Sequence, residues 1–305
     1  MSNTIQGRDI ASNRFGSLAE FTGSFADAAA LQAQFTRDGY VLLRQAIDRS
    51  QVLNARREVL TRLRDVGEIE GPIIDGRLTG RSDRPDPALD QGQFWRSVND
   101  GPELRGVTHG PATQAIVASI LGAAARPHEL MYLRPMAPGL GTPLHYDYPF
   151  FAKDATKIHT VWLPLGDITL GDGPLAVIEK SFQFDDLLAP IRATRFDRDH
   201  SNEAVQSAAY ESANAQHPVE LAEARSVRIL STDFQAGDMV VFSGFLMHGS
   251  LDNHSPNNRV RLSCDVRYQP FDDPYDDDRY FGQHPRGSKG GGYADMRGAQ
   301  PLKKS

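Results

Sequence analysis

The chain has 305 residues, of which 40% are hydrophobic and 24% charged, and its formal net charge is −6. This composition is typical of a folded globular protein, and the acidic balance disfavours an extended nucleic-acid surface. No apolar run approaches the roughly 20 residues that cross a bilayer, residues 1–20 hold no apolar signal segment, and the single cysteine, Cys264, excludes an intrachain disulfide. We therefore expect a cytoplasmic protein without nucleic-acid or membrane partners. The sequence indicates no particular oligomeric state.

The first part of the chain predicts helices. Residues 27–66 show the spacing of a helix, a short strand and a second helix, for which Ser50 is the expected N-cap. Residues 67–95 are rich in Gly, Pro and Asp, which predicts a loop. Residues 101–125 are helical again in pattern. We expect residues 27–128 to form a mainly helical N-terminal layer.

From residue 129 the pattern changes to short apolar segments separated by Gly and Pro, which is typical of a jelly roll. The expected strands are Glu129–Pro135, Pro143–Tyr148, Ile158–Leu165, Leu175–Ile178, Ser226–Ser231, Met239–Ser243 and Arg259–Tyr268. We expect one domain over residues 1–305, mainly β with α additions. Its core would be a cupin-like double-stranded β-helix over residues 129–268, flanked by the N-terminal helices. A polar insertion at about 182–216 predicts a lid, and residues 269–305 predict a loop-rich tail.

The segment Arg259–Tyr268 alternates between polar and apolar residues with the period of a strand. Two interpretations of its polar face are open. The polar side chains line a cavity while the apolar ones pack against the N-terminal helices, or the polar side chains meet water.

The clearest functional motif is His145-Tyr146-Asp147, followed by His248 and Arg259. A His-x-Asp pair places both side chains on one face of a strand, and a distant histidine completes a facial triad for non-haem Fe(II). Such a triad leaves coordination positions open for O2 and a co-substrate. The arginine fork suits a carboxylate. The sequence therefore predicts an iron oxygenase that uses a 2-oxo acid, with both histidines neutral when they bind the metal.

Two alternatives and two further candidates lie close to this motif. His254 lies near the second histidine, and Arg261 shares the strand face of the arginine. Tyr132 and Arg134, on the strand before the motif, are placed to reach the co-substrate or the substrate.

Several segments carry a recognisable family pattern. They are Phe35–Leu43, Pro138–Asp147, Val161–Leu165, Asp172–Ile178, Ala236–Phe242 and His248–Arg259. Together they cover most of the chain between residues 35 and 268, and they resemble the phytanoyl-CoA dioxygenase family of Fe(II)/2-oxoglutarate oxygenases.

The resemblance implies a role for each matching residue. Arg259, which lies 11 residues after the second histidine, matches the arginine that pairs with the distal carboxylate of 2-oxoglutarate. Trp162 and Ser250 match positions that contact the co-substrate in some members. The positions of the iron ligands are filled by His145, Asp147 and His248.

The resemblance also implies an activity, the hydroxylation of a C–H bond of a small-molecule metabolite by Fe(II), 2-oxoglutarate and O2, with release of succinate and CO2. Asp147 argues against the related halogenases, which lack a carboxylate there. One segment departs from the family, because Glu179–Phe182 stands where Pro-Gly-Ser-His is usual, so no single relative indicates the substrate. The alternative functions are a cupin-type metal dioxygenase without a 2-oxo acid and a non-catalytic ligand-binding barrel.

Overall fold

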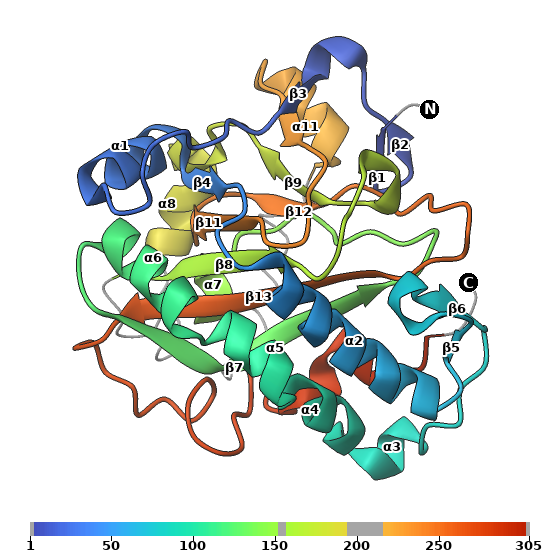
Figure 1. The fold of residues 1–305 in the computed structure, drawn as a ribbon. Coiled ribbons are helices and arrows are strands. Elements are labelled where there is room, and N and C mark those ends of the chain that lie inside the picture. The colour runs from blue at the N-terminus through green and yellow to red at the C-terminus, as the bar shows by residue number, and fades with distance from the viewer. Residues whose placement is uncertain (1–2, 152–156, 194–215, 303–305) are drawn as a thin grey trace.

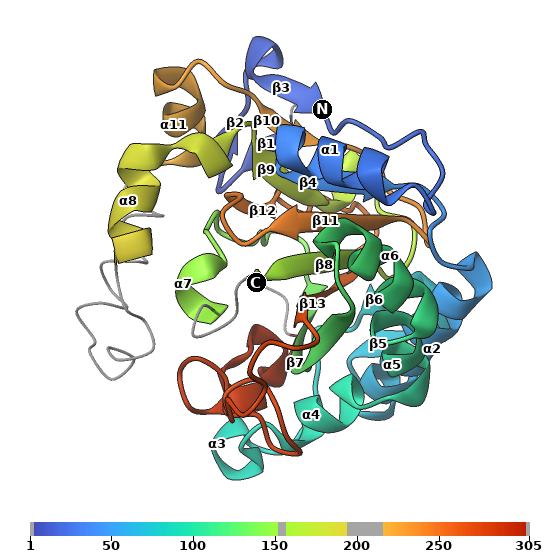
Figure 2. The same ribbon diagram turned by 90° about the vertical axis from the view of Figure 1, so that its left-hand side faces the viewer.

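The structure is a computed structural model that describes residues 3–151, 157–193 and 216–302. Two β-sheets face each other, and helices cover the outer face of the larger sheet (Figures 1 and 2). This is the jelly-roll core that the sequence predicts. Within the described residues, no helix is long and apolar enough to cross a membrane.

The larger sheet has five strands, and every pair of neighbours in it is antiparallel. In spatial order they are β4 (Tyr40–Leu43), β11 (Met239–Ser243), β8 (His159–Pro164), β13 (Arg261–Pro270) and β7 (Ala125–Met136). Because β13 is hydrogen-bonded on both sides, by β8 and by β7, its side chains project from a backbone that is fixed within the sheet.

The smaller sheet has four strands and includes a segment from the N-terminus. Its order is β12 (His248–Ser250), β9 (Leu175–Ile178), β10 (Ile229–Ser231) and β3 (Phe15–Ser17), of which β3 runs parallel to β10. The sequence did not predict β3 or β12, because three residues are too few for a periodic signal. Thr4–Ile5 (β1) and Arg8–Asp9 (β2) form a separate two-stranded ladder.

Helices make up most of the N-terminal layer. They are α1 (Ala28–Asp38), α2 (Arg49–Asp65), α3 (Pro87–Asp90), α4 (Gln93–Asn99), α5 (Pro102–Thr108) and α6 (Pro111–Leu121). The prediction of Ser50 as the N-cap of α2 is wrong, because the Asp48 carboxylate accepts the backbone N–H groups of Ser50 and Gln51. The predicted loop over 67–95 also contains a small ladder, β5 (Ile69–Glu70) with β6 (Arg77–Leu78).

The two faces of β13 lie in different environments. Its apolar face packs on the helices, and the hydroxyl of Tyr268 donates to the carbonyl of Thr108 in α5 at 2.6 Å. Its polar face is buried as well, since Arg261, Asp265 and Arg267 are 4%, 2% and 1% exposed. The polar face therefore lies in the interior between the two sheets, so the cavity interpretation is confirmed and the solvent interpretation is wrong.

The segment around the His-x-Asp motif differs from the prediction. Pro143–Tyr148 is not a strand, because its only ladder contact is a single bridge between His145 and His248. Beyond it the chain turns, as the Phe150 N–H donates to the Asp147 carbonyl at 3.0 Å and α7 (Tyr148–Phe151) begins. The motif therefore consists of an extended residue, His145, that bridges to β12, followed by a turn that begins at Asp147.

The predicted lid lies largely outside the described residues, which omit 194–215. The described parts of this region are a 3₁₀ turn at Ser181–Gln183, α8 (Asp185–Ala193) and α11 (Pro218–Ala224). The tail is rich in loops, but not all of it lies in solvent. It packs Tyr293, Met296 and Leu302 into the main hydrophobic core.

Candidate metal centre

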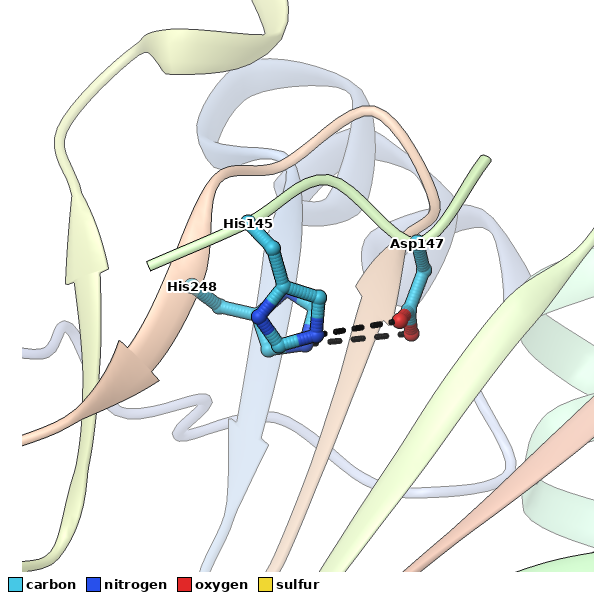
Figure 3. Close-up of side chains that lie close together, drawn as sticks. All are labelled: His145, Asp147 and His248. Carbon is cyan, nitrogen blue, oxygen red and sulfur yellow. Dashed lines mark ion pairs between the residues drawn. The ribbon is translucent and has the colours of Figure 1, made fainter. Parts of the chain in front are cut away.

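Three side chains converge between the two sheets (Figure 3). One ligand atom from each of His145, Asp147 and His248 lies within 4.8 Å of the others. The Nε2 atom of His145 is 3.4 Å from Asp147 Oδ1, and that of His248 is 3.8 Å from Asp147 Oδ2. The alternative His254 is not part of this group, because its Nε2 lies 2.6 Å from the hydroxyl of Thr4 at the protein surface.

The backbone sets the orientation of both imidazoles. The Nδ1 atom of His145 lies 2.9 Å from the Pro143 carbonyl, and that of His248 lies 3.0 Å from the Leu246 carbonyl. Since a carbonyl only accepts, Nδ1 carries the proton in each ring and Nε2 offers its lone pair to the centre. Burial lowers the pKa of His248 to about 3, so this ring is neutral at physiological pH.

The carboxylate of Asp147 is buried but strongly hydrogen-bonded. Arg267 Nη2 donates to both of its oxygens at 2.7 Å, and Thr160 Oγ1 donates to Oδ2 at 2.6 Å. Burial by itself would raise the pKa of Asp147, but the positive charge of Arg267 holds it well below its ordinary range. The ligand is therefore an anion in the folded protein.

This donor set fits Fe(II). Two neutral imidazoles and one carboxylate are the ligands of the non-haem iron facial triad. The buried Nε2 of His248 has no hydrogen-bond partner among the described residues, and an unsatisfied buried acceptor is costly unless something binds it. A metal ion held by these three residues satisfies that atom.

The two candidate arginines of the last strand occupy different places. Arg259 donates to the Asp172 carboxylate at 2.8 Å, and its side chain is 35% exposed. Arg261 is 4% exposed and lines a small cavity of about 10 Å³ together with His145 and His248. The structure therefore brings Arg261, rather than Arg259, next to the triad.

Trp162 also lines the small cavity, and the centre of its ring lies 4.7 Å from that of Phe234. Ser250 lies on β12, two residues beyond His248, but its hydroxyl already forms two hydrogen bonds. It donates to the Leu251 carbonyl and accepts the N–H of Thr142. Trp162 is thus accessible from the cavity, whereas Ser250 holds the loop before the His-x-Asp motif.

Tyr132 and Arg134 both face a larger cavity of about 320 Å³ beside the triad. Arg134 borders the small cavity as well, where it forms an ion pair with Asp265. The wider surface cavity of about 600 Å³ lies between α4 and the tail, away from the metal ligands. The remaining wall of the 320 Å³ cavity is mainly apolar and includes Leu144, Phe150, Phe151 and Met296.

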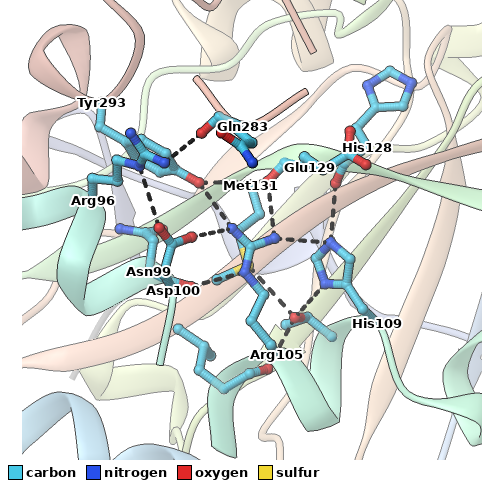
Figure 4. A network of polar contacts seen from close by, with 12 residues as sticks. Arg96, Asn99, Asp100, Arg105, His109, His128, Glu129, Met131, Gln283 and Tyr293 are labelled. Atoms are coloured by element: carbon cyan, nitrogen blue, oxygen red, sulfur yellow. Dashed lines mark hydrogen bonds and ion pairs between the residues drawn. The ribbon is translucent and has the colours of Figure 1, made fainter. Parts of the chain in front are cut away.

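The C-terminal tail closes one side of the 320 Å³ cavity, through Gly287–Lys289, Gly292, Asp295 and Met296. Arg105 anchors this part of the tail through Tyr293 (Figure 4). Its guanidinium donates to the Glu129 carbonyl at 2.9 Å, to the Asp100 carboxylate at 2.8 Å and to the Tyr293 hydroxyl at 3.1 Å. The cavity wall is thus fixed to α5 and β7.

Three functional positions escaped the sequence analysis. Arg267 and Asp265 lie on the polar face of β13, where the alternation was visible but gave no reason to single them out. Thr160 lies opposite Arg267 on β8. Nothing in the Gly-rich sequence of the tail indicated a cavity wall, because its position depends on contacts with distant elements.

Comparisons with known proteins identify a matching family model and similar proteins. The family model described as phytanoyl-CoA dioxygenase (PhyH) matches residues 35–261. A protein named 1-deoxypentalenic acid 11-beta-hydroxylase, from Streptomyces exfoliatus, is 26% identical over 80% of this chain and 82% of its own.

Two solved structures share the fold. The α-ketoglutarate-dependent carbocyclase SnoK of nogalamycin biosynthesis has a TM-score of 0.51 at 18% identity, covering 85% of this chain and 89% of its own. The epimerase SnoN, in complex with Fe3+, α-ketoglutarate and nogalamycin RO, has a TM-score of 0.50 at 18% identity, covering 92% and 95%.

Proposed function

The chain belongs to the phytanoyl-CoA dioxygenase family, and from this premise we propose that it is a hydroxylase acting on a C–H bond of a small-molecule metabolite. It is an oxygenase that depends on Fe(II), 2-oxoglutarate and O2. The observation that carries the proposal is the His-Asp-His triad, whose half-buried member His145 also lines a cavity large enough for a small molecule. A cytoplasmic location remains a prediction.

The protein and the iron have separate tasks. When bound, Fe(II) and 2-oxoglutarate supply the activation of O2, with 2-oxoglutarate converted to succinate and CO2. His145, Asp147 and His248 are the residues that would hold the metal, and a facial triad of this kind would leave positions open for the co-substrate and O2. The apolar wall at Phe150 and Phe151 orients the substrate and excludes water from the reacting C–H bond.

Arg261 is the residue we propose for the distal carboxylate of 2-oxoglutarate. Burial lowers its pKa to about 10, so it remains a cation at neutral pH. Its Nε donates to the Gly173 carbonyl and its Nη1 to the Ser263 hydroxyl, while Nη2 has no hydrogen-bond partner in the described part of the chain. One donor of a fixed guanidinium is therefore available to a carboxylate.

The small cavity beside Arg261 has the size of about one water molecule. A five-carbon diacid reaches it from the larger cavity only when the Arg134 side chain moves away from Asp265. Because both cavities share Arg134, Thr142 and His145, this movement joins them into one channel from the metal to Arg261. The proposal thus assigns Arg134 to the path of the co-substrate.

The two alternative functions fit the site less well. A cupin-type dioxygenase without a 2-oxo acid has no need of a buried cation beside the metal ligands. A ligand-binding barrel has no need of three converging ligand atoms with an unpaired imidazole nitrogen. The relative from Streptomyces exfoliatus is named for an acid substrate, so 1-deoxypentalenic acid is the first compound to try.

The test is an anaerobic titration of the Fe(II)-loaded protein with 2-oxoglutarate, followed through the weak visible metal-to-ligand charge-transfer band. The band is expected in the wild-type protein and absent in Asp147→Ala, which lacks a ligand. Iron binding without a band would contradict the use of 2-oxoglutarate and favour the cupin-type alternative. Failure to bind iron would favour the ligand-binding barrel. Substrate screening then follows succinate release and product mass.

A further inference from the structure

We propose that Arg267 is a positioning residue that makes Asp147 a one-oxygen metal ligand. Its guanidinium, together with the Thr160 hydroxyl, occupies Oδ2 and leaves Oδ1 for the metal. This inference rests on the metal-binding role of Asp147, but it concerns a residue beyond the segment 35–261 that the family model matches.

The hydrogen bonds on Asp147 are unevenly divided between its two oxygens. Oδ2 accepts from Arg267 Nη2 at 2.7 Å, from Arg267 Nε at 3.2 Å and from Thr160 Oγ1 at 2.6 Å. Oδ1 accepts only from Arg267 Nη2, at 2.7 Å, among the described residues. An ionised carboxylate offers about two lone-pair sites per oxygen, so Oδ2 is saturated and Oδ1 retains one free site.

The same oxygen, Oδ1, lies on the side of His145, with 3.4 Å to its Nε2. Oδ2 lies 3.8 Å from the Nε2 of His248, so each oxygen is near one imidazole, and it is the free lone-pair site that makes Oδ1 the oxygen available to a metal ion. Binding through both oxygens would require Oδ2 to give up its donors from Arg267 and Thr160. One-oxygen binding leaves the three open positions that the co-substrate and O2 need.

Arg267 is itself held rigidly. It lies opposite Thr160 in the ladder of β13 with β8, so both donors to Oδ2 come from one cross-strand pair. Its guanidinium carbon lies 4.2 Å from the centre of the Phe151 ring and 4.8 Å from that of the Tyr132 ring. With 1% of its surface exposed, the side chain has little room to rotate.

The geometry distinguishes positioning from mere charge compensation. A lysine at residue 267 keeps the positive charge but cannot present the two nitrogens of the guanidinium plane to one carboxylate. If Arg267 acts only through its charge, Arg267→Lys preserves the site. If it acts through its fork, Arg267→Lys weakens metal binding although the charge remains.

The experiment measures Co(II) binding to the otherwise metal-free protein by competition with a chromophoric chelator, and records the visible spectrum of the Co(II) form. The variants are Arg267→Lys and Arg267→Met. Arg56→Met is the matched control, because Arg56 is also a buried arginine but donates to the carbonyls of Ile74 and Leu165, away from the triad. Circular dichroism and thermal melting establish that each variant is folded.

We expect both Arg267 variants to bind Co(II) about 10- to 100-fold more weakly, the usual effect of losing a residue that orients a metal ligand. Their spectra should also change, because Asp147 is free to rotate. Arg56→Met should bind as the wild type does. Binding by folded Arg267→Lys within about twofold of wild type, with an unchanged spectrum, overturns the proposal whatever Arg267→Met does, because the charge alone then suffices. If Arg267→Met does not fold, Arg267→Lys alone decides. A wild-type protein that binds no Co(II) instead overturns the metal site itself.

Discussion

The sharpest prediction concerns the two arginines at the start of the last strand. We consider Arg261→Met and Arg259→Met, which remove the charge and keep an unbranched side chain. Arg261 is buried beside the triad, whereas Arg259 is 35% exposed and paired with Asp172. The two variants thus separate a cation inside the cavity from a cation at its outer edge.

The expected magnitudes follow from burial. Removing one partner of a buried, hydrogen-bonded charge pair costs about 2–4 kcal/mol, which corresponds to about 30- to 1000-fold in the dissociation constant of 2-oxoglutarate. An ion pair as exposed as that of Arg259 with Asp172 contributes about 0–1 kcal/mol to stability. Its loss should therefore change 2-oxoglutarate binding by less than about threefold and the melting temperature by a few degrees.

The assay is the anaerobic charge-transfer titration, with Fe(II) kept saturating so that metal affinity does not enter the result. The reasoning is refuted if Arg259→Met raises the dissociation constant more than about 30-fold while Arg261→Met leaves it unchanged. That outcome would place the carboxylate at the outer edge of the barrel, where the family resemblance puts it. Restoration by Arg261→Lys to within about tenfold would support a charge interaction at residue 261.

Three further predictions concern Asp147, one buried histidine and the tail. Asp147→Asn removes the anionic ligand, and Fe(II) binding measured by equilibrium dialysis should fall more than about 100-fold; retained binding would contradict the triad. Burial lowers the pKa of His128 from 6.5 to about 3. As the pH falls from 7 to 5, this imidazole therefore becomes protonated in the unfolded chain but stays neutral in the native protein. This residue should therefore reduce the free energy of unfolding by about 2 kcal/mol from pH 7 to pH 5, and urea titrations of His128→Gln should show a pH dependence shallower by that amount. A Cβ at Gly298 would lie 2.1 Å from the Trp95 ring, so Gly298→Ala should destabilise the protein by about 1–3 kcal/mol. The control is Gly106→Ala on α5, where an added Cβ meets no other atom within 4 Å and should not destabilise the protein. Equal stability of the two variants would contradict the close packing of the tail.

Local patterns predicted much of this fold correctly. The expected strands Leu175–Ile178 and Met239–Ser243 match β9 and β11 residue for residue, because short apolar runs between turn residues have few other solutions. Pro143–Tyr148 failed as a strand, since an extended step with one bridge has the same composition as a short strand. Whether an extended segment pairs with a neighbour depends on that neighbour, which a local pattern does not contain.

The sequence by itself indicated the three side chains that the structure brings together, because a His-x-Asp motif followed by a later histidine is chemically specific. It did not determine which arginine faces the metal. Arg259 and Arg261 have the same parity on the strand, so a period of two does not separate them. What separates them is tertiary pairing, since Arg259 bridges to Arg77 at the edge, whereas the ladder of β13 with β7 begins with Arg261 opposite Met136. The sequence also did not determine the position of the tail that forms the cavity wall, because contacts between distant segments decide where a loop without a periodic pattern lies.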